Sequence, residues 1–267
     1  MPKSRLDVLM VERELAENRS LAQRLIMAGQ VRVNGQVELR SGARVPANAH
    51  LDIEHGPRFV SRGGEKLEAA LQTFEITVDG LVCADVGAST GGFTDCLLQH
   101  GASRVYAIDV GHGILDWKLR QDERVVVVEG TNARFIETLP DAVELITIDV
   151  SFISLKIILP VVMNWLSKNS QQNPSGTVIA LIKPQFEAGR QQVGRGKGVI
   201  RDPLIHQQVL TELLDFALHE GYVVRGLVRS PIMGPKGNVE FLAWLECPGE
   251  QALSIAELIK SVLPDLD

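Results

Sequence analysis

The sequence predicts an α/β protein in which a doubly wound, mostly parallel sheet follows a small α+β domain. The first observation is an apolar run at 81–84 that leads into closely spaced glycines and a helix-like segment at 93–100, the order in which doubly wound folds begin. The second is that later apolar strands alternate with helical segments, which is typical of parallel βαβ units. The third is that the first 54 residues follow another pattern, with two short helices and a hairpin.

Composition limits the classes of protein that remain open. The chain has 267 residues, of which 45% are hydrophobic, enough to bury the core of one large domain or of a large and a small one. The formal net charge of −6 argues against non-specific nucleic-acid binding by the whole chain. Residues 1–50 carry +3, however, and leave −9 for the rest, so we expect a basic N-terminal part on an acidic body.

No apolar run reaches membrane-spanning length, and the N-terminus lacks the apolar core of a signal peptide. We therefore expect a soluble, cytoplasmic protein. Cys83, Cys96 and Cys247 are scattered and lack metal-ligand spacing, so we expect buried free thiols and no metal site.

The N-terminal part is predicted to form two helices and a hairpin. Apolar residues recur with helical period over 5–17, and a second helix is expected to begin at Ser20, as its N-cap, and to stop at Gly29. Two short alternating strands flank Asn34-Gly35, a strong hairpin pattern. Four arginines of this part are candidate RNA contacts: Arg5, Arg19, Arg24 and Arg32.

The stretch from 18 to 35 resembles the S4 RNA-binding domain, and the resemblance covers residues 5–54. It implies that these arginines and the helix ends hold the backbone of a structured RNA rather than reading its bases. An ordinary protein-interaction module is the alternative. We place this domain at 1–54, an interdomain linker containing Gly56-Pro57 at 55–60, and a second domain at 61–267.

The second domain contains the predicted sheet. Strands are expected at 81–84, 105–109, 125–128, 145–149, 178–183, 222–228 and 240–245, after a helix that begins near Ser61. The last two strands are separated only by a turn region at 234–238, so they must pair antiparallel. A parallel sheet that ends in such a hairpin is the Rossmann-like methyltransferase architecture.

The glycine-rich turn limits the choice of ligand. It lacks the Lys-Ser/Thr pair of a phosphate-binding P-loop and fits Gly-x-Gly-x-x-Gly poorly, while Asp85 suits a cationic group. The stretch resembles motif I of the S-adenosylmethionine-dependent methyltransferases, which implies that cofactor; a glycine turn that only connects strand to helix is the alternative. The implied cofactor residues are Asp85, Gly87, Ala88, Ser89, Thr90, Gly91, Gly92 and Phe93.

Two further residues follow neighbouring strands. Asp109 ends the second strand, where an acidic residue can accept both ribose hydroxyls of a nucleoside, and Asn132 could face the adenine. A helix cap or turn residue is the alternative for each. Trp117 is interpreted as a core residue.

Four charged residues are the catalytic candidates: Lys66, Asp149, Lys183 and Glu240. Asp149 and Lys183 end the fourth and fifth strands, at the edge where ligands bind in open α/β sheets. A lysine among charged groups can be tuned to take a proton from a ribose hydroxyl. The methyl sulfonium supplies the leaving group, so no metal is needed. Ordinary surface ion pairs are the alternative.

These four residues resemble the Lys-Asp-Lys-Glu tetrad of FtsJ-type ribose 2′-O-methyltransferases. The resemblance extends to the surrounding stretches, which are 61–67, the Asp149 strand, 182–187 and 238–241. An S4 domain ahead of such a domain is similar to the TlyA family, whose members are named haemolysins and ribosomal RNA (cytidine-2′-O)-methyltransferases. The resemblance implies Lys183 as the base, Asp149 and Lys66 orienting it and the hydroxyl, and Glu240 completing the network. Rival functions are a membrane-active haemolysin and a non-catalytic RNA-binding assembly factor.

A glycine-rich, basic stretch directly follows the proposed base. We expect a mobile loop that closes on RNA through Arg190, Arg195 and Lys197, and we include Arg62 among the RNA contacts. A plain solvated loop is the alternative. Ribosomal RNA, within a ribosomal subunit, is the expected partner, with no membrane and no obligate protein partner, and the target nucleotide is open.

Overall fold

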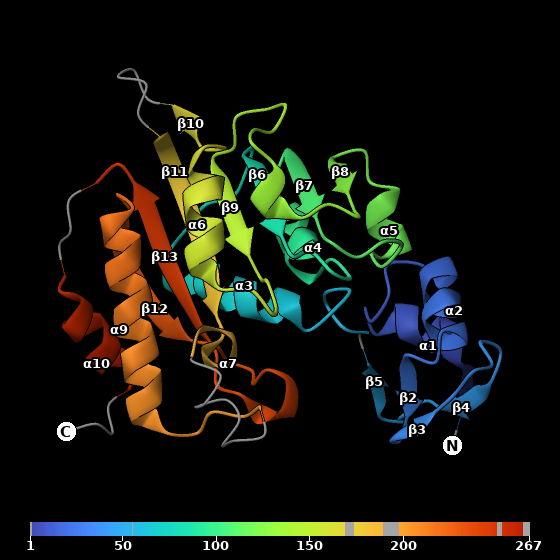
Figure 1. Cartoon of the computed structure of the whole chain (residues 1–267). Helices are drawn as coiled ribbons and strands as arrows, with labels where there is room; N and C mark the ends of the chain where they lie inside the picture. Colours follow the sequence, from blue (N-terminus) through green and yellow to red (C-terminus); the bar gives the residue numbers. More distant parts are fainter. Residues whose placement is uncertain (1, 55, 169–173, 189–197, 250–252, 264–267) are drawn as a thin grey trace. The chain divides into compact units, whose positions relative to one another are not determined.

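The computed structural model describes residues 2–54, 56–168, 174–188, 198–249 and 253–263 (Figure 1). The chain divides into two compact units, Met1–Arg58 and Phe59–Asp267. Phe59 and Val60, which the sequence places in a linker, instead pack in the second unit, where the Phe59 ring is buried. The physical reason is that Phe59 lies directly over Gly64, where a side chain would collide with the ring.

The first unit packs two helices on short antiparallel strands. Its elements are β1 (Lys3–Arg5), α1 (Leu6–Glu12), α2 (Arg19–Met27), β2 (Val31–Val33), β3 (Gln36–Val37), β4 (Arg44–Pro46) and β5 (Leu51–Ile53). The strands form a three-stranded sheet, β3-β2-β5, and a pair, β1-β4. Leu6, Leu9 and Met10 on α1 meet Ala22 and Ile26 on α2 in one core, as their helical spacing predicts.

Local details of this unit both confirm and correct the sequence analysis. The hairpin at Asn34-Gly35 is confirmed, and both residues have the positive φ that the tight turn requires. Ser20 is not the N-cap of the second helix. The cap is Asn18, whose side chain accepts a hydrogen bond from the Leu21 amide, so α2 begins at Arg19.

The second unit is built on one sheet in the order β12-β13-β11-β9-β6-β7-β8, with β10 beside β11. The strands are β6 (Val82–Val86), β7 (Arg104–Ile108), β8 (Val125–Val128), β9 (Leu145–Ile148), β10 (Ser167–Lys168), β11 (Pro174–Ile182), β12 (Val223–Arg229) and β13 (Phe241–Cys247). Pairing is parallel throughout the series β8-β7-β6-β9-β11. Strand β13, by contrast, pairs antiparallel with both β11 and β12. The predicted parallel sheet with an antiparallel hairpin at its end is confirmed.

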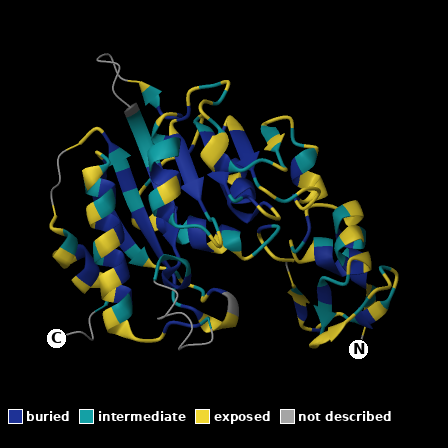
Figure 2. Cartoon of the chain, in the orientation of Figure 1, coloured by how far each residue is buried: buried dark blue, intermediate teal, exposed yellow. Residues whose placement is uncertain are grey.

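Helices cover both faces of this sheet. They are α3 (Gly63–Thr73), α4 (Gly92–Gln99), α5 (Trp117–Arg120), α6 (Leu155–Met163), α7 (Pro184–Glu187), α9 (Pro203–His219) and α10 (Ile255–Val262), with short 3₁₀ turns η1 (Ala133–Phe135) and η2 (Pro235–Gly237). Figure 2 shows the central strands, such as β6 and β9, as mostly buried, whereas β8 at the edge is partly exposed. None of the described helices combines the length and the hydrophobicity that a membrane span requires.

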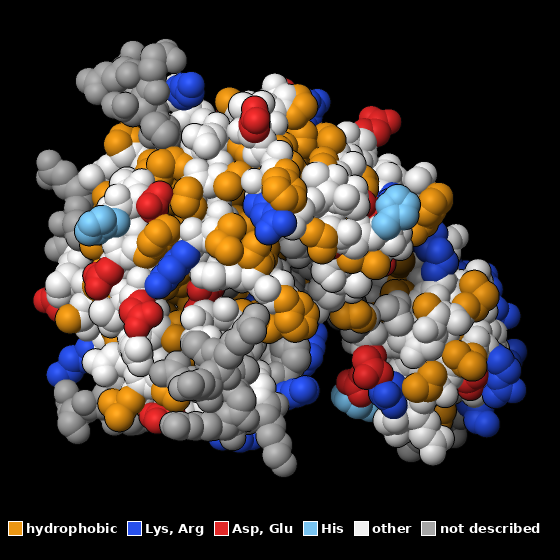
Figure 3. Space-filling model, viewed as in Figure 1, with side chains coloured by type: hydrophobic (Ala, Val, Ile, Leu, Met, Phe, Trp, Pro, Cys, Tyr) orange, Lys and Arg blue, Asp and Glu red, His pale blue; other side chains and the backbone are white. Residues whose placement is uncertain are grey.

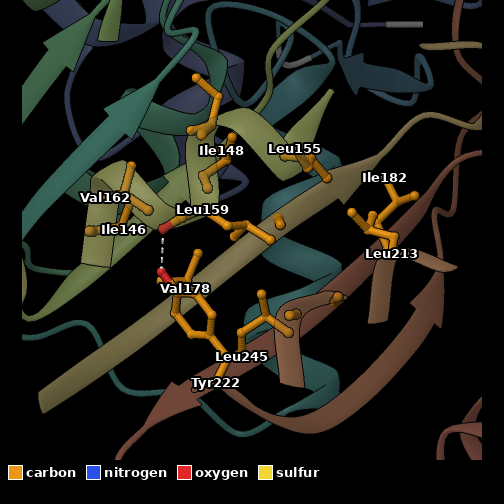
Figure 4. Close-up of a cluster of buried hydrophobic side chains, with 14 of the residues drawn as sticks. Ile146, Ile148, Leu155, Leu159, Val162, Val178, Ile182, Leu213, Tyr222 and Leu245 are labelled. Carbon is orange, nitrogen blue, oxygen red and sulfur yellow. Dashed lines mark hydrogen bonds between the residues drawn. The ribbon is translucent and has the colours of Figure 1, made fainter. Parts of the chain in front are cut away.

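Alternating strand residues divide the core of this unit into two layers. Ile146, Ile148 and Val178 pack with α6 and α9 on one face, and Tyr222 donates a hydrogen bond to the Leu159 carbonyl at 2.8 Å (Figure 4). The residues that alternate with these along the same strands point to the other face of the sheet and pack against α3 and α4. Because both faces are covered, the carboxyl edge of the parallel strands is where the sheet can present polar groups. Cys83, Cys96 and Cys247 are buried free thiols, as expected.

Candidate active site

The glycine-rich turn lies between β6 and α4, at the carboxyl edge of the sheet. Gly87 has φ +87°, and a Cβ atom there would lie 2.6 Å from the Asp149 carbonyl oxygen. Gly91, which precedes α4, has φ +98°, and a Cβ atom there would collide with Leu119. These positions therefore need glycine both for their backbone conformation and for the close approach of neighbouring elements.

Three cavities adjoin this turn, and all three are lined by Gly87, Ser89 and Asp149. Their volumes are about 670, 420 and 900 Å³. We name them the β7 cavity, the α3 cavity and the lysine cavity, because they extend past the end of β7, the start of α3 and the catalytic lysine candidates, respectively. A ligand at the turn can thus reach three compartments at once.

Asp109 and Asn132, for which the sequence predicts contacts with the nucleoside of the cofactor, both line the β7 cavity. The two Asp109 carboxylate oxygens accept hydrogen bonds from the backbone amides of Ser89 at 2.8 Å and Gly111 at 2.7 Å. Asn132 Oδ1 accepts a hydrogen bond from the Arg134 amide and so caps η1. The alternative interpretation of Asn132 as a helix cap is therefore correct for this oxygen atom. Val110 and Ile114 add an apolar wall. Polar groups and an apolar wall of this kind suit a nucleoside.

The α3 cavity is lined by most of the predicted motif residues: Gly87, Ala88, Ser89, Thr90, Gly92 and Phe93. Asp85 is an exception and corrects the sequence analysis, which expects its carboxylate to face a cationic ligand. The side chain is 0% exposed and accepts hydrogen bonds from Thr94 Oγ1 at 2.7 Å and Thr147 Oγ1 at 3.2 Å. It turns inward because β6 is covered on both faces, and burial raises the pKa of this carboxyl to about 7.

The four catalytic candidates all line the lysine cavity. Lys183 Nζ lies 2.6 Å from Asp149 Oδ1, and Lys66 Nζ lies 2.5 Å from Glu240 Oε2. Both lysines and Glu240 are buried. The structure therefore arranges the four residues as two ion pairs, whereas the sequence analysis expects Lys66 and Asp149 to act together on Lys183.

Sequence reasoning missed Ser151. Lys183 Nζ also donates a hydrogen bond to Ser151 Oγ at 2.9 Å, so this ammonium group lies between a carboxylate and a hydroxyl. Ser151 follows Asp149 by two residues at the end of β9, and a polar residue so close to a strand's carboxyl end is a pattern that could have identified it.

Two aromatic residues also border the lysine cavity. The rings of Phe152 and Phe186 lie 4.8 Å apart, and Lys183 Nζ is 5.8 Å from the centre of the Phe186 ring. Phe152 is 90% exposed and has φ +64°, an uncommon conformation for a bulky residue. The prediction that Trp117 is a core residue is wrong. This residue is 73% exposed, because Leu115 and Leu119, two positions away on either side, take the buried face.

The predicted RNA contacts of the first unit are organised by acidic residues. Asp7 is 0% exposed and accepts hydrogen bonds from Arg5 Nε and Nη2, from Arg19 Nε and from Gln23. The Arg5 guanidinium holds the pKa of the Asp7 carboxyl well below its usual range. Figure 3 shows Lys and Arg side chains distributed over the visible face of this unit, with acidic side chains among them.

The remaining predicted RNA contacts differ in their surroundings. Arg32 Nη2 pairs with Glu54 Oε2 at 2.7 Å, and Arg24 is exposed on α2. Arg62 is exposed and lines the α3 cavity of the second unit. Arg190, Arg195 and Lys197 lie outside the described residues.

Comparisons with known proteins agree with this arrangement. Residues 59–247 match the FtsJ-like methyltransferase family and residues 4–51 match the S4 domain. The chain is 51% identical to YqxC of Bacillus subtilis, a candidate rRNA methyltransferase, over 93% of this chain and 87% of that protein. It is 41% identical to TlyA of Mycobacterium tuberculosis, a 16S/23S rRNA (cytidine-2′-O)-methyltransferase, over 97% of this chain and 96% of that protein.

A solved structure of a candidate hemolysin from Streptococcus thermophilus is 44% identical to this chain and superposes with a TM-score of 0.73, covering 99% of this chain and 96% of the other. Because the chain matches both domain families and resembles these proteins over nearly its whole length, it belongs to the TlyA family, in which an S4 domain is joined to an FtsJ-like methyltransferase domain.

Proposed function

We propose that the protein is a 2′-O-methyltransferase that modifies a ribose of ribosomal RNA, at a cytidine, with S-adenosylmethionine as its cofactor. The observation that carries this proposal is the pair of lysine–carboxylate contacts in the lysine cavity, directly beside the glycine-rich turn. Membership of the FtsJ-like methyltransferase family supports the cofactor. The ribosomal substrate and the cytidine are supported by the name of the M. tuberculosis relative.

The cavities fit the cofactor by the chemistry of their donors and acceptors. In the β7 cavity, the Asp109 carboxylate and the Asn132 amide are suited to a ribose and a base, and Val110 and Ile114 to the flat face of a base. The α3 cavity is lined by the exposed residues Ser89 and Thr90 and suits the methionine part. When bound, S-adenosylmethionine supplies a methyl group on a positively charged sulfur.

The lysine cavity then has the groups needed to activate a ribose hydroxyl. In its neutral amine form, Lys183 is the base that takes the proton of the 2′-hydroxyl, and Asp149 and Ser151 hold the resulting ammonium group from two directions. Lys66 and Glu240 form the second pair of the cavity and fix its wall. Burial of both lysines limits the access of water to their nitrogen atoms.

The first unit is proposed to dock the RNA. Arg5, Arg19, Arg24 and Arg32 lie in a unit that matches the S4 domain, and the two arginines on Asp7 are held for contacts with phosphates. We assign this role to the first unit, residues 1–58, and methyl transfer to the second unit, residues 59–267. A ribosomal substrate also locates the protein in the cytoplasm and makes a ribosomal subunit its partner.

The test is transfer of a radiolabelled methyl group from S-adenosylmethionine to purified ribosomal subunits and to naked ribosomal RNA. Wild-type protein should place label in RNA as a 2′-O-methyl nucleotide, and Lys183→Ala should lower the rate by at least about 100-fold while leaving cofactor affinity unchanged. Lys168→Ala, a change at an exposed lysine of β10, is the matched control and should behave as wild type.

Two results would contradict the proposal. Cofactor binding without label on any RNA would favour the non-catalytic assembly factor. Lysis of vesicles or erythrocytes by the purified protein, in the absence of methyl transfer, would favour the haemolysin.

A further inference from the structure

Gln185 carries a buried amide group in the lysine cavity. It lies on α7, two residues after Lys183, and its side chain lines the lysine cavity together with both ion pairs. Only 7% of the residue is exposed. Its Oε1 atom is removed from water and has no hydrogen-bond partner within the part of the chain that the structure describes.

A second buried amide in the same cavity shows the contrast. Asn238 Nδ2 donates to the Gly198 carbonyl at 3.1 Å, and Asn238 Oδ1 accepts from the Ile200 amide at 3.1 Å. Asn238 is thus used to hold the backbone. A buried amide oxygen without a donor destabilises a fold, and proteins rarely retain one. Gln185 is therefore placed to receive its donor from a ligand of the lysine cavity.

The chemistry of the substrate identifies that donor. If the proposed function holds, the nucleotide to be methylated enters this cavity with its 2′-hydroxyl at Lys183. Cytosine has an exocyclic amino group at the position where uracil has a carbonyl oxygen, so an acceptor on the protein can bind the first and is repelled by the second. Ribose hydroxyls, by contrast, are the same in both nucleotides and allow no selection.

We infer that Gln185 selects cytidine over uridine by accepting a hydrogen bond from the exocyclic amino group of the target cytosine. The inference rests on the proposed function and adds a specificity-determining residue to it. Gln185 takes no part in proton removal, so its loss should change the choice of base more than the chemical step.

The experiment compares two substrates that differ at one position. The methylated nucleotide is first mapped with wild-type protein, and ribosomal subunits are then prepared with cytidine or, by mutation of the rRNA gene, with uridine at that position. The ratio of kcat/KM for the two substrates is measured for wild type, Gln185→Met and Gln185→Glu. Gln208→Met, a change at an exposed glutamine of α9, is the matched control.

Wild type and Gln208→Met should prefer cytidine by about tenfold or more. Gln185→Met, which keeps the size of the side chain but has no comparable acceptor, should bring the ratio close to one, mainly by losing activity on cytidine. Gln185→Glu keeps an acceptor and should retain the preference, whatever its overall rate. Thermal melting and cofactor affinity identify any variant that fails to fold.

An unchanged ratio in Gln185→Met would overturn the inference, and so would an equal loss on both substrates by a folded variant, since that would place the contact on the ribose. Both results leave the proposed function standing. Failure of wild type to methylate either substrate, although it binds the cofactor, would instead refute the proposed function itself.

Discussion

Lys66 Nζ lies 2.5 Å from Glu240 Oε2, although 174 positions separate the two residues. Lys66 belongs to α3, and Glu240 directly precedes β13. The second carboxylate oxygen, Oε1, has no partner among the residues that the structure describes, and a Cβ atom at Gly234 would lie only 2.0 Å from it. The contact thus joins two distant segments and requires glycine at a third.

Breaking this contact should strongly destabilise the second unit. Lys66→Met leaves a buried carboxylate without its cation, and we expect the free energy of unfolding to fall by about 3–5 kcal/mol. Adding Glu240→Gln removes the unpaired charge and should restore part of this loss, while methyl transfer stays impaired. Urea unfolding of the wild type and of the single and double variants measures both effects. A double variant no more stable than Lys66→Met would contradict the ion-pair interpretation.

Ser151 should contribute to catalysis by orienting Lys183. Loss of the hydroxyl in Ser151→Ala removes one of two contacts to the ammonium group, and a hydrogen bond to a charged group contributes roughly 1.5–3 kcal/mol, so kcat should fall by about tenfold or more with little change in the KM for RNA. Ser151→Thr retains a hydroxyl and should recover most of the rate. Steady-state kinetics on ribosomal subunits tests this. Equal rates for Ser151→Ala and wild type would assign the contact a structural role only.

The sequence was sufficient to place the candidate site because the parallel strands bring their carboxyl ends together. Asp149 and Lys183 end strands that turned out to be neighbours, so their contact follows from strand order alone. The partner of Lys66 could not be derived in this way. It depends on how α3 packs beside the antiparallel end of the sheet, which no local pattern records.

Two errors have a common physical cause. The predictions for Asp85 and Trp117 rest on residue type, yet the direction of each side chain depends on which face of its element is covered. Alternation along β6 points Asp85 toward Thr94 and the interior, and the short α5 turns Trp117 outward. The direction of the side chain from its strand or helix, rather than the residue type, therefore determines where Asp85 and Trp117 lie.

The buried Asp85 carboxyl should make stability depend on pH. Its pKa is raised to about 7 by burial, whereas an unfolded aspartate ionises near 3.8. Between these values the folded state retains a proton that the unfolded state has lost, so the free energy of unfolding should decrease as the pH rises from about 4 to about 7. The slope should reach at most about 1.4 kcal/mol per pH unit.

Asp85→Asn cannot ionise and should remove this component of the pH dependence, which urea unfolding at several pH values between 4.5 and 7.5 can measure. Asp215→Asn, at an exposed position of α9, is the control and should keep the wild-type slope. A slope that survives in Asp85→Asn would show that another group titrates in this range.

Asp7 should act as a positioning residue for RNA binding by the first unit. Its buried carboxylate anchors Arg5 and Arg19, whose side chains remain about half exposed. Asp7→Asn removes a negative charge, which by itself would strengthen binding to a polyanion. If the anchored geometry matters more, affinity for ribosomal subunits should instead weaken by about tenfold, because both arginines lose the charged partner that orients them.

Titration of ribosomal subunits over a series of KCl concentrations separates the two effects. The plot of log Kd against log salt should become shallower by about one for each phosphate contact that is lost. Asp52→Asn, at an exposed position of β5, is the control and should leave the slope unchanged. Equal or tighter binding by a folded Asp7→Asn protein, with the wild-type salt slope, would mean that Arg5 and Arg19 serve the packing of α1 and α2 and not the contact with RNA.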